Sequence, residues 1–292
     1  MKKSVMLLAV LGFVQAAAAQ NADDYRGGWT TDADSSEPHT YEFSIRGDQV
    51  RGIYCTYCSD ATTLAFVDGK FNADRLSFVV THVNANGSTA YQDHADARFD
   101  HGNLLVTGTS GAPGGAKFQW TLHKDSRGPD PLPIPVSRLP PAPPVPPVPF
   151  PGGGQRQPYV QPGPWQQLSE AHVIGVWLGF GVGMNKQFFI IRKVGNKLRG
   201  MVCGRCDNPY TMAALDDFEI QGDTLKFNIL HEDWGPGSLP FHNQVTAHIA
   251  KNEMRITTVQ DNMAKPAPGL AAANFGASLL GPIAAEATAG NR

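Results

Sequence analysis

The chain has 292 residues, of which 41% are hydrophobic and 17% charged, and its 24 Lys and Arg residues nearly balance 26 Asp and Glu residues. Because the formal net charge is only −2, the chain has no basic field that would attract nucleic acid or an anionic membrane surface. The length is sufficient for about two domains.

The first residues have the pattern of a secretory signal peptide. Lys2 and Lys3 precede an apolar run over 5–14, which is too short to span a bilayer, and Ala16 to Ala19 supply a small-residue cleavage site. We therefore expect cleavage of 1–19 and a periplasmic or secreted bacterial protein that inserts no segment into the membrane afterwards. A buried N-terminal helix is the alternative interpretation. Cleavage would leave 22 basic against 26 acidic residues, a net charge of −4.

A first all-β domain is predicted over 20–126. Apolar residues alternate with polar ones in short runs, and turn-forming pairs such as Asn86-Gly87 separate the runs. Such alternation is typical of half-buried antiparallel strands, and roughly ten residues per strand favour an up-and-down barrel or a sandwich. The alternating sets are Tyr41, Phe43 and Ile45; Leu76, Phe78 and Val80; Leu104 and Val106; Phe118, Trp120 and Leu122.

Residues 127–164 contain 15 of the chain's 23 prolines. Proline lacks the amide proton that a strand or helix needs and fixes φ, so the segment is predicted to be a polyproline II linker. A ligand for a proline-binding module is the alternative interpretation.

The second domain, predicted over 165–260, is a copy of the first. Arg-Gly-x-x-Cys-x-x-Cys occurs twice, 148 positions apart, and uses all four cysteines of the chain. An internal repeat of this kind indicates two domains of the same fold. The aligned residues include Gly27-x-Trp29 with Gly175-x-Trp177, Arg51 to Cys58 with Arg199 to Cys206 and, after one inserted residue, Asp68 with Asp217 and His82 with His231.

The C-terminal segment over 261–292 is rich in Ala, Gly and Pro, and its sequence shows no equivalent of the last strand of the first repeat. It is expected to be a tail that is either disordered or forms a short helix around Leu279 and Leu280.

The order of a Gly-x-Trp, a strand, a glycine turn and a second strand resembles the N-terminal strands of the calycins, the lipocalin- and avidin-like barrels. The resemblance covers about thirty residues of each repeat, and the Cys-x-x-Cys motif is foreign to it. It implies two tandem antiparallel up-and-down barrels. It also implies that Trp29 and Trp177 each close the bottom of a barrel as core residues.

Three interpretations of the Cys-x-x-Cys pairs remain open. An exported protein favours a disulfide within each pair, Cys55 with Cys58 and Cys203 with Cys206. If the two repeats faced each other, all four cysteines could instead bind one zinc ion. A redox-active pair would need a lowered thiolate pKa, which a helix N-terminus commonly supplies, and no helix is predicted there.

Two histidines occupy equivalent positions at the end of an apolar row. By alternation, His82 shares a face with three apolar residues of its strand, and His231 does the same. If these rows point into the barrels, each histidine lies near a mouth. A hairpin centred near Gly87 would bring Asp93 beside His82, and the matching residue for His231 is Asn243. The rows are Leu76, Phe78 and Val80, and Leu225, Phe227 and Ile229.

An inward histidine held by a carboxylate suits a general base, and a polar group in an apolar cup can also orient a ligand. Alternatively, these residues satisfy one another at a solvated rim. The catalytic candidates are His82, Asp93 and His231. The ligand-binding candidates are His82, Tyr91, His231, Asp233, Phe241, His242 and Asn243.

Neither a metal nor a cofactor is expected. Neighbouring residues on a strand face opposite ways, so at most two of His231, Glu232 and Asp233 could converge on a metal with His242. Phosphate-loop, dinucleotide and His-Glu-x-x-His motifs do not occur in the sequence. The remaining charged candidates, Arg51 and Arg199, are expected to form structural ion pairs with Asp68 and Asp217.

Three functions fit this sequence. The first is an exported binding protein for a small apolar or aromatic molecule, since the small residues Ala95, Ala97 and Ala247 on the inner rows would leave room for one. The second is a barrel enzyme, such as an isomerase, cyclase or hydrolase, that uses His and Asp acid–base chemistry. The third is an envelope structural or interaction module. Because the repeats differ at their rims, we expect different ligands and a more specialised second repeat; no protein partner is indicated.

Overall fold

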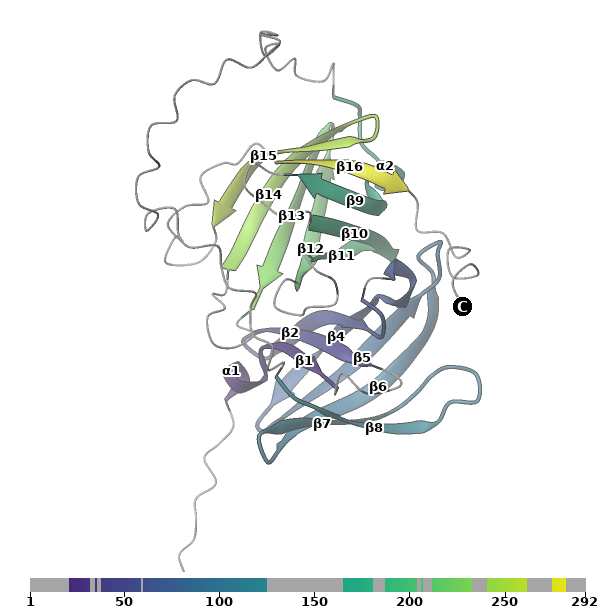
Figure 1. The fold of residues 1–292 in the computed structure, drawn as a ribbon, viewed down its shortest axis with the longest axis vertical. Helices are drawn as coiled ribbons and strands as arrows, with labels where there is room; N and C mark the ends of the chain where they lie inside the picture. Colours follow the sequence, from purple (N-terminus) through teal and green to yellow (C-terminus); the bar gives the residue numbers. More distant parts are fainter. Residues whose placement is uncertain are drawn as a thin grey trace, which may run out of the picture.

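The computed structural model describes residues 21–31, 35, 38–58, 60–124, 165–180, 187–203, 206, 212–232, 241–261 and 275–281. The expected signal peptide and proline-rich linker lie outside these residues. The described part is almost entirely antiparallel β-sheet, as predicted, and forms two barrel-like domains (Figure 1). None of its helices is long and apolar enough to cross a membrane.

The first domain is an eight-stranded sheet in which each strand pairs with its neighbour in sequence. The sheet curls until its first and last strands approach, where Thr30 and His123 form an isolated bridge. Its elements are α1 (Ala22–Tyr25), β1 (Gly27–Thr30), β2 (Thr40–Arg46), β3 (Gln49–Cys55), η1 (Ala61–Thr63), β4 (Ala65–Asn72), β5 (Arg75–Val83), β6 (Thr89–Asp100), β7 (Asn103–Thr109) and β8 (Lys117–Leu122).

The second domain is a closed barrel, because β16 pairs with both β15 and β9. The helix expected around Leu279 and Leu280 is therefore wrong. The small residues of β16 have weak strand propensity, and the hydrogen bonds to two neighbouring strands determine its conformation. The elements are α2 (Glu170–Val173), β9 (Gly175–Phe180), β10 (Gln187–Val194), β11 (Lys197–Cys203), β12 (Met212–Gln221), β13 (Thr224–His231), β14 (Phe241–Ala250), β15 (Glu253–Asp261) and β16 (Phe275–Gly281).

Each domain has its own core, made by the inward row of every strand. Trp29 and Trp177 are at most 2% exposed, and the indole of each donates a 2.9 Å hydrogen bond to the short helix that precedes its strand, at Tyr25 O and Val173 O. Both tryptophans are therefore core residues, as the resemblance implied, and the equivalent contact in each domain supports their common origin.

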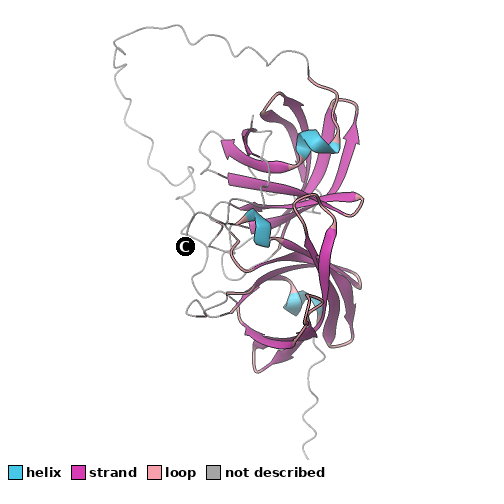
Figure 2. Ribbon diagram, turned by 90° about the vertical axis from the view of Figure 1, so that its right-hand side faces the viewer, coloured by secondary structure: helices cyan, strands magenta, loops and turns pink. Residues whose placement is uncertain are grey.

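A third apolar cluster joins the two domains, which pack through their outer faces (Figure 2). The repeated motif supplies its centre. Arg51, Ile53 and Cys55 form the outer row of β3, and Arg199, Met201 and Cys203 occupy the equivalent row of β11. We call this contact the interdomain cluster. Its buried members are Ile53, Cys55, Cys58, Leu64, Phe66, Val83, Ile190, Met201, Cys203, Met212, Ala214 and Leu230.

The predicted ion pairs of Arg51 and Arg199 form, and their shortest contacts join the two repeats. Arg199 contacts Asp68 at 2.6 Å, and Arg51 contacts Asp216 and Asp217 at 2.9 Å each. The inserted residue of the second repeat explains the extra aspartate. Asp217 has a φ of +53° at a register shift between β12 and β13, so Asp216 takes the place of Asp68 in the strand. The two domains are thus related by an approximate two-fold axis.

Arg192 of the second domain links the two domains through a set of hydrogen bonds. Its side chain is buried, and its guanidinium donates to five backbone carbonyls of the first domain. Burial lowers the pKa of Arg192, and the negative charge of Asp60 opposes that shift. The acceptors are the carbonyl oxygens of Ala61, Thr62, Leu64, Val83 and Asn84.

Candidate functional site

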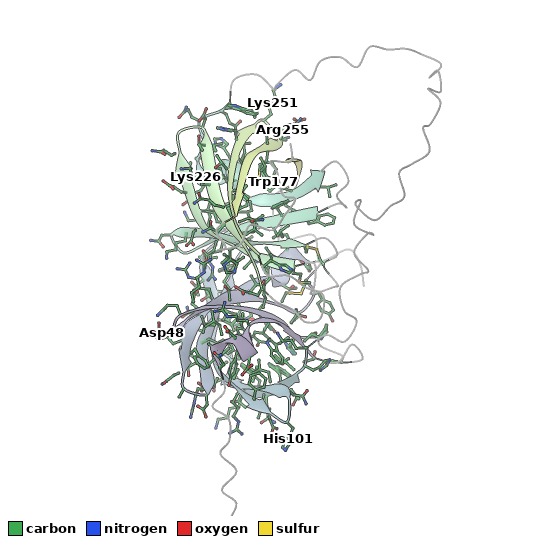
Figure 3. The ribbon with its side chains drawn as sticks, turned by 90° about the vertical axis from the view of Figure 1, so that its left-hand side faces the viewer. Asp48, His101, Trp177, Lys226, Lys251 and Arg255 are labelled. Carbon is green, nitrogen blue, oxygen red and sulfur yellow. A yellow bond between two sulfur atoms is a disulfide. The ribbon has the colours of Figure 1, made fainter. Side chains whose placement is uncertain are left out.

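Packed side chains occupy the interior of each domain. In the first domain Trp29, Tyr41 and Phe43 are almost fully buried, and Ala95 and Ala97 belong to the same packed cluster. Ala247 is likewise part of the second core. Figure 3 shows side chains crowding both interiors. Packed core side chains therefore occupy the space that these alanines were expected to leave for a ligand. A ligand of the first domain would have to bind at the open end of its sheet.

The β5–β6 hairpin places His82 beside Asp93, as the sequence predicted. The His82 Nε2 lies 2.9 Å from one Asp93 carboxylate oxygen. The other oxygen accepts hydrogen bonds from the Ser110 hydroxyl at 2.7 Å and the Gly111 amide at 3.0 Å. Because the β7–β8 loop supplies these two donors, the carboxylate holds the imidazole in one orientation.

Aromatic rings surround this pair. Tyr91 stacks on His82 with ring centroids 4.2 Å apart, and Tyr54 meets the same imidazole edge-on at 5.7 Å. The Tyr54 hydroxyl lies 2.8 Å from His39 Nδ1, and His39 stacks on Trp120 at 3.8 Å. We call this group, completed by Phe118 beside Trp120, the mouth cluster. Its members are His39, Tyr54, His82, Tyr91, Asp93, Phe118 and Trp120.

The mouth cluster combines buried and accessible groups. Tyr91, Phe118 and Trp120 are partly exposed, whereas His39 and Tyr54 are 4% and 7% exposed. Burial lowers the pKa of His82, although its hydrogen bond to Asp93 and the carboxylate charge oppose that shift. The imidazole is therefore neutral at neutral pH. An ionised Asp93 only accepts hydrogen bonds, which assigns the proton to Nε2 and leaves Nδ1 as an acceptor.

The second domain has a different arrangement at the equivalent end. His231 lies at the end of β13 opposite Phe241, and both His231 and Asn243 are buried. Val202 replaces the tyrosine found at position 54 of the first domain. Asp233 lies outside the described residues, as does the Phe241 side chain, so their roles remain predictions. The catalytic or binding roles of His82, Asp93, Tyr91, His231 and Asn243 also remain predictions.

His242 does not lie with His231, because it pairs with Leu230, whose side chain faces the opposite side of the sheet in the interdomain cluster. The His242 side chain faces the first domain. Its Nε2 lies 2.9 Å from Glu232 of its own domain, and its Nδ1 lies 3.3 Å from Arg46 of the first domain. Glu232 is 2% exposed, accepts from the Ser44 hydroxyl and lies 3.5 Å from Arg26. Glu232 and His242 therefore both belong to the interdomain contact, and a ligand-binding role for His242 remains a prediction.

Glu232 gives the interdomain contact a predicted acid sensitivity. Burial alone would raise the pKa of Glu232, but hydrogen bonds from His242 and Ser44 and the charges of His242 and Arg26 hold it below its ordinary value of 4.5. The folded chain therefore binds fewer protons than the unfolded chain in this range. The stabilising contribution of the ionised Glu232 is present above pH 4.5 and is lost as the pH falls through the pKa of Glu232 in the folded chain.

We accordingly expect Glu232→Gln to lower the free energy of unfolding most near neutral pH. The difference from the wild type should shrink steadily toward pH 3, because both chains then carry a neutral side chain at this position. Urea unfolding at several pH values measures the difference, and Glu219→Gln on the exposed part of β12 is the control. A difference that stays constant from neutral to acidic pH would rule out this role.

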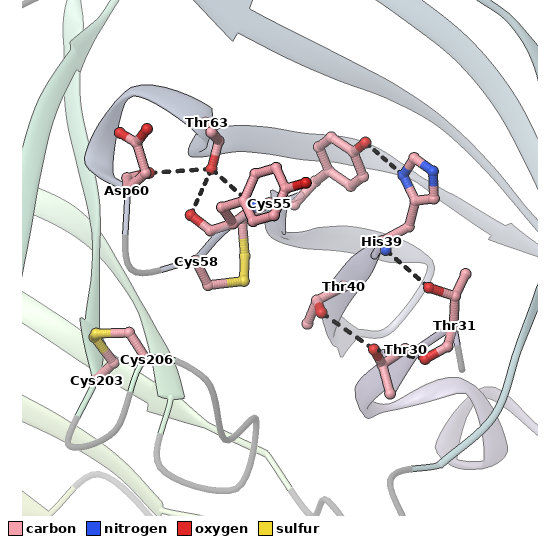
Figure 4. The surroundings of a disulfide bond; sticks show 12 residues. Thr30, Thr31, His39, Thr40, Cys55, Cys58, Asp60, Thr63, Cys203 and Cys206 are labelled. Atoms are coloured by element: carbon pink, nitrogen blue, oxygen red, sulfur yellow. Dashed lines mark hydrogen bonds between the residues drawn. A yellow bond between two sulfur atoms is a disulfide. The ribbon is translucent and has the colours of Figure 1, made fainter. Parts of the chain in front are cut away.

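The four cysteines form two disulfides, Cys55–Cys58 and Cys203–Cys206, as favoured from the sequence (Figure 4). Both lie in or against the interdomain cluster. The repeats do face each other, as the zinc interpretation required, but the described His, Cys, Asp and Glu residues contain no group of three or more that could hold a metal. The motif therefore serves the contact between the domains.

Sequence reasoning missed four members of the mouth cluster as site residues, namely His39, Tyr54, Phe118 and Trp120. Tyr54 and Trp120 lie on inward rows, and Trp120 was read only as a core residue. His39 lies just before β2, outside the alternating residues of that strand, so its position beside Trp120 depends on the curl of the whole sheet. The sequence did hold a signal for Tyr54, because alternation places it on the inward row of its strand. Only the closure of the sheet, however, brings these rings together.

Comparison of the chain with protein-family models, with curated proteins and with solved structures finds no significant match. The chain's own residues therefore carry the functional inference.

Proposed function

We propose that this chain is an exported binding protein whose first domain takes a small molecule with a planar aromatic or apolar group at the mouth cluster. The observation that supports this most is the set of partly exposed rings, Tyr91, Phe118 and Trp120, around a hydrogen-bonded His82–Asp93 pair. Rings left partly accessible beside oriented polar groups are a typical lining for a small-molecule site.

The chemistry of the cluster selects for two features of the ligand. An aromatic or flat apolar group can stack on the accessible face of Trp120 or Phe118, with a gain of about 0.5–1.5 kcal/mol beyond the buried area. A donor group on the ligand can meet the acceptor Nδ1 of the neutral His82. Because Asp93 is already occupied by His82, Ser110 and Gly111, its role is to hold the imidazole in place.

The packed core restricts the ligand to the end of the barrel. Tyr41 is 2% exposed and stacks on Phe43, and both close the path below the mouth cluster. The proposed site therefore lies at the end of the barrel and not beside the inward alanines, and it favours a small or partly inserted ligand.

Binding of N-phenyl-1-naphthylamine, a neutral aromatic probe with one N–H donor, tests the proposal. Its fluorescence should rise saturably with the wild-type chain, and Trp120→Ala should weaken binding at least tenfold, which corresponds to about 1.4 kcal/mol. Trp165→Ala is the matched control, because Trp165 stacks on His248 in the second domain at 5.2 Å.

The proposal fails if the wild-type chain shows no saturable signal, or if both tryptophan variants lose the same affinity. Thermal unfolding of each variant accompanies the titration. A Trp120→Ala variant that binds the probe normally and unfolds at the wild-type temperature would also exclude the mouth cluster as the site.

A further inference from the structure

An open groove of about 680 Å³, lined by both polar and apolar groups, crosses the outer face of the first domain from β4 to β8. Strand register arranges its floor as two parallel rows of side chains. One row runs Lys70, Ser77, Asp96 and Thr107, and the other runs Asp68, Val79, His94, Thr109 and Lys117. The groove lies on the opposite side of the sheet from the core and is separate from the mouth cluster.

Two glycines line the floor of the groove. A Cβ on Gly69 would lie 2.5 Å from the Phe78 Cβ, and one on Gly108 would lie 2.5 Å from the Phe118 ring. The backbone at both positions therefore lies directly against an inward side chain, with no space for a Cβ between them. Any larger residue at either position would push the strand outward.

The aspartates of the groove have partners within the chain, and its two lysines form no ion pair with another described residue. Asp68 pairs with Arg199, and Asp96 accepts a hydrogen bond from Ser77. Lys70 and Lys117 are exposed, and neither has an ion pair with another described residue. They stand at opposite corners of the groove, on strands separated by four strand spacings, or roughly 19 Å along the sheet. One compact anion cannot contact both.

We infer that this groove binds an extended acidic oligosaccharide. Its carboxylates would meet Lys70 and Lys117, and its hydroxyls would donate to Asp96 and exchange hydrogen bonds with Thr107 and Thr109. The central carboxylate of Asp96 disfavours an acidic peptide, which has fewer hydroxyl donors to offer it. The groove also crosses the strands, where the sheet's amides and carbonyls are already paired, so a peptide could not add as a further strand.

The second domain provides an internal comparison. The position equivalent to Lys70 is Glu219, which reverses the charge at that corner, while Lys226 lies beside it on β13. Figure 3 shows Lys226 on the outside of the second domain. The charge pattern of the groove therefore differs between the two domains at this corner, and Lys226 supplies a lysine of similar setting for a control.

Calorimetric titration of the full chain with trigalacturonate tests the inference, with neutral maltotriose and an oligoglutamate peptide as comparison ligands. We expect saturable binding of trigalacturonate only, at least tenfold weakening in Lys70→Glu/Lys117→Glu, and no change in Lys226→Glu. Thermal unfolding confirms that each variant is folded.

Three results would overturn it. Trigalacturonate that does not bind the wild-type chain would exclude this ligand class, and oligoglutamate that binds equally well would show general attraction of anions. Equal losses in the double variant and in Lys226→Glu would place the effect outside the groove. None of these results depends on the mouth cluster, so this inference and the proposed function can fail separately.

Discussion

Replacement of Arg192 by alanine should separate the two domains while leaving each barrel folded. The guanidinium donates to five carbonyls of the first domain, and its loss leaves several of these acceptors without a partner at a buried surface. Each buried polar group left unsatisfied costs about 1–3 kcal/mol. We therefore expect the contact between the domains to lose about 3 kcal/mol or more, partly offset where water enters.

Small-angle scattering and calorimetry measure this result. The radius of gyration should rise, and unfolding should split into two transitions as the domains lose their shared surface. Arg75→Ala is the control, because Arg75 is an exposed arginine whose nearest carboxylate, on Asp74, is 3.6 Å away. If Arg192→Ala keeps the wild-type radius and a single transition, the anchoring role is wrong.

A charge at Met201 should have a still larger effect. Met201 is 0% exposed at the centre of the outer row of β11, inside the interdomain cluster but outside both domain cores. Met201→Asp would bury a carboxylate with no partner among apolar side chains, and such a charge costs several kcal/mol. The domains should therefore undock, while far-UV circular dichroism keeps its β-sheet signal.

Leu105→Asp supplies the matched comparison. Leu105 is a partly exposed residue on β7 and is not a member of the interdomain cluster, so its carboxylate stays in water and the domains should remain docked. Undocking is read from the radius of gyration and from proteolysis between the domains. A docked Met201→Asp chain, or equal undocking by both variants, would mean that this cluster does not hold the domains together.

The sequence predicted the fold well because the strands of both repeats carry strict period-two alternation. Tyr41, Phe43 and Ile45 lie inward as expected, and the pairing of His82 with Asp93 followed from one hairpin. Local information was sufficient in these cases, since hairpin register and side-chain alternation together place residues on one face.

The docking of the domains could not be predicted in the same way. Arg51, Ile53 and Cys55 appear in the sequence as the polar-facing side of a strand, and alternation alone does not show that a second domain covers it. Likewise, the sequence places His242 among the ligand-binding candidates and Glu232 beside a possible metal site. The approximate two-fold axis turns them toward Ser44 and Arg46 instead. Strand β16 was missed because its conformation comes from its neighbours.

The central claim is that the repeated Arg-Gly-x-x-Cys-x-x-Cys motif docks the two domains through their outer faces. Methyl nuclear Overhauser spectroscopy of the wild-type chain tests it most directly. Cross-peaks should connect methyl groups of the first domain, on Ile53, Leu64 and Val83, with methyl groups of the second, on Ile190, Met201 and Leu230. A spectrum in which each set contacts only its own domain, with the cysteines oxidised, would contradict the account.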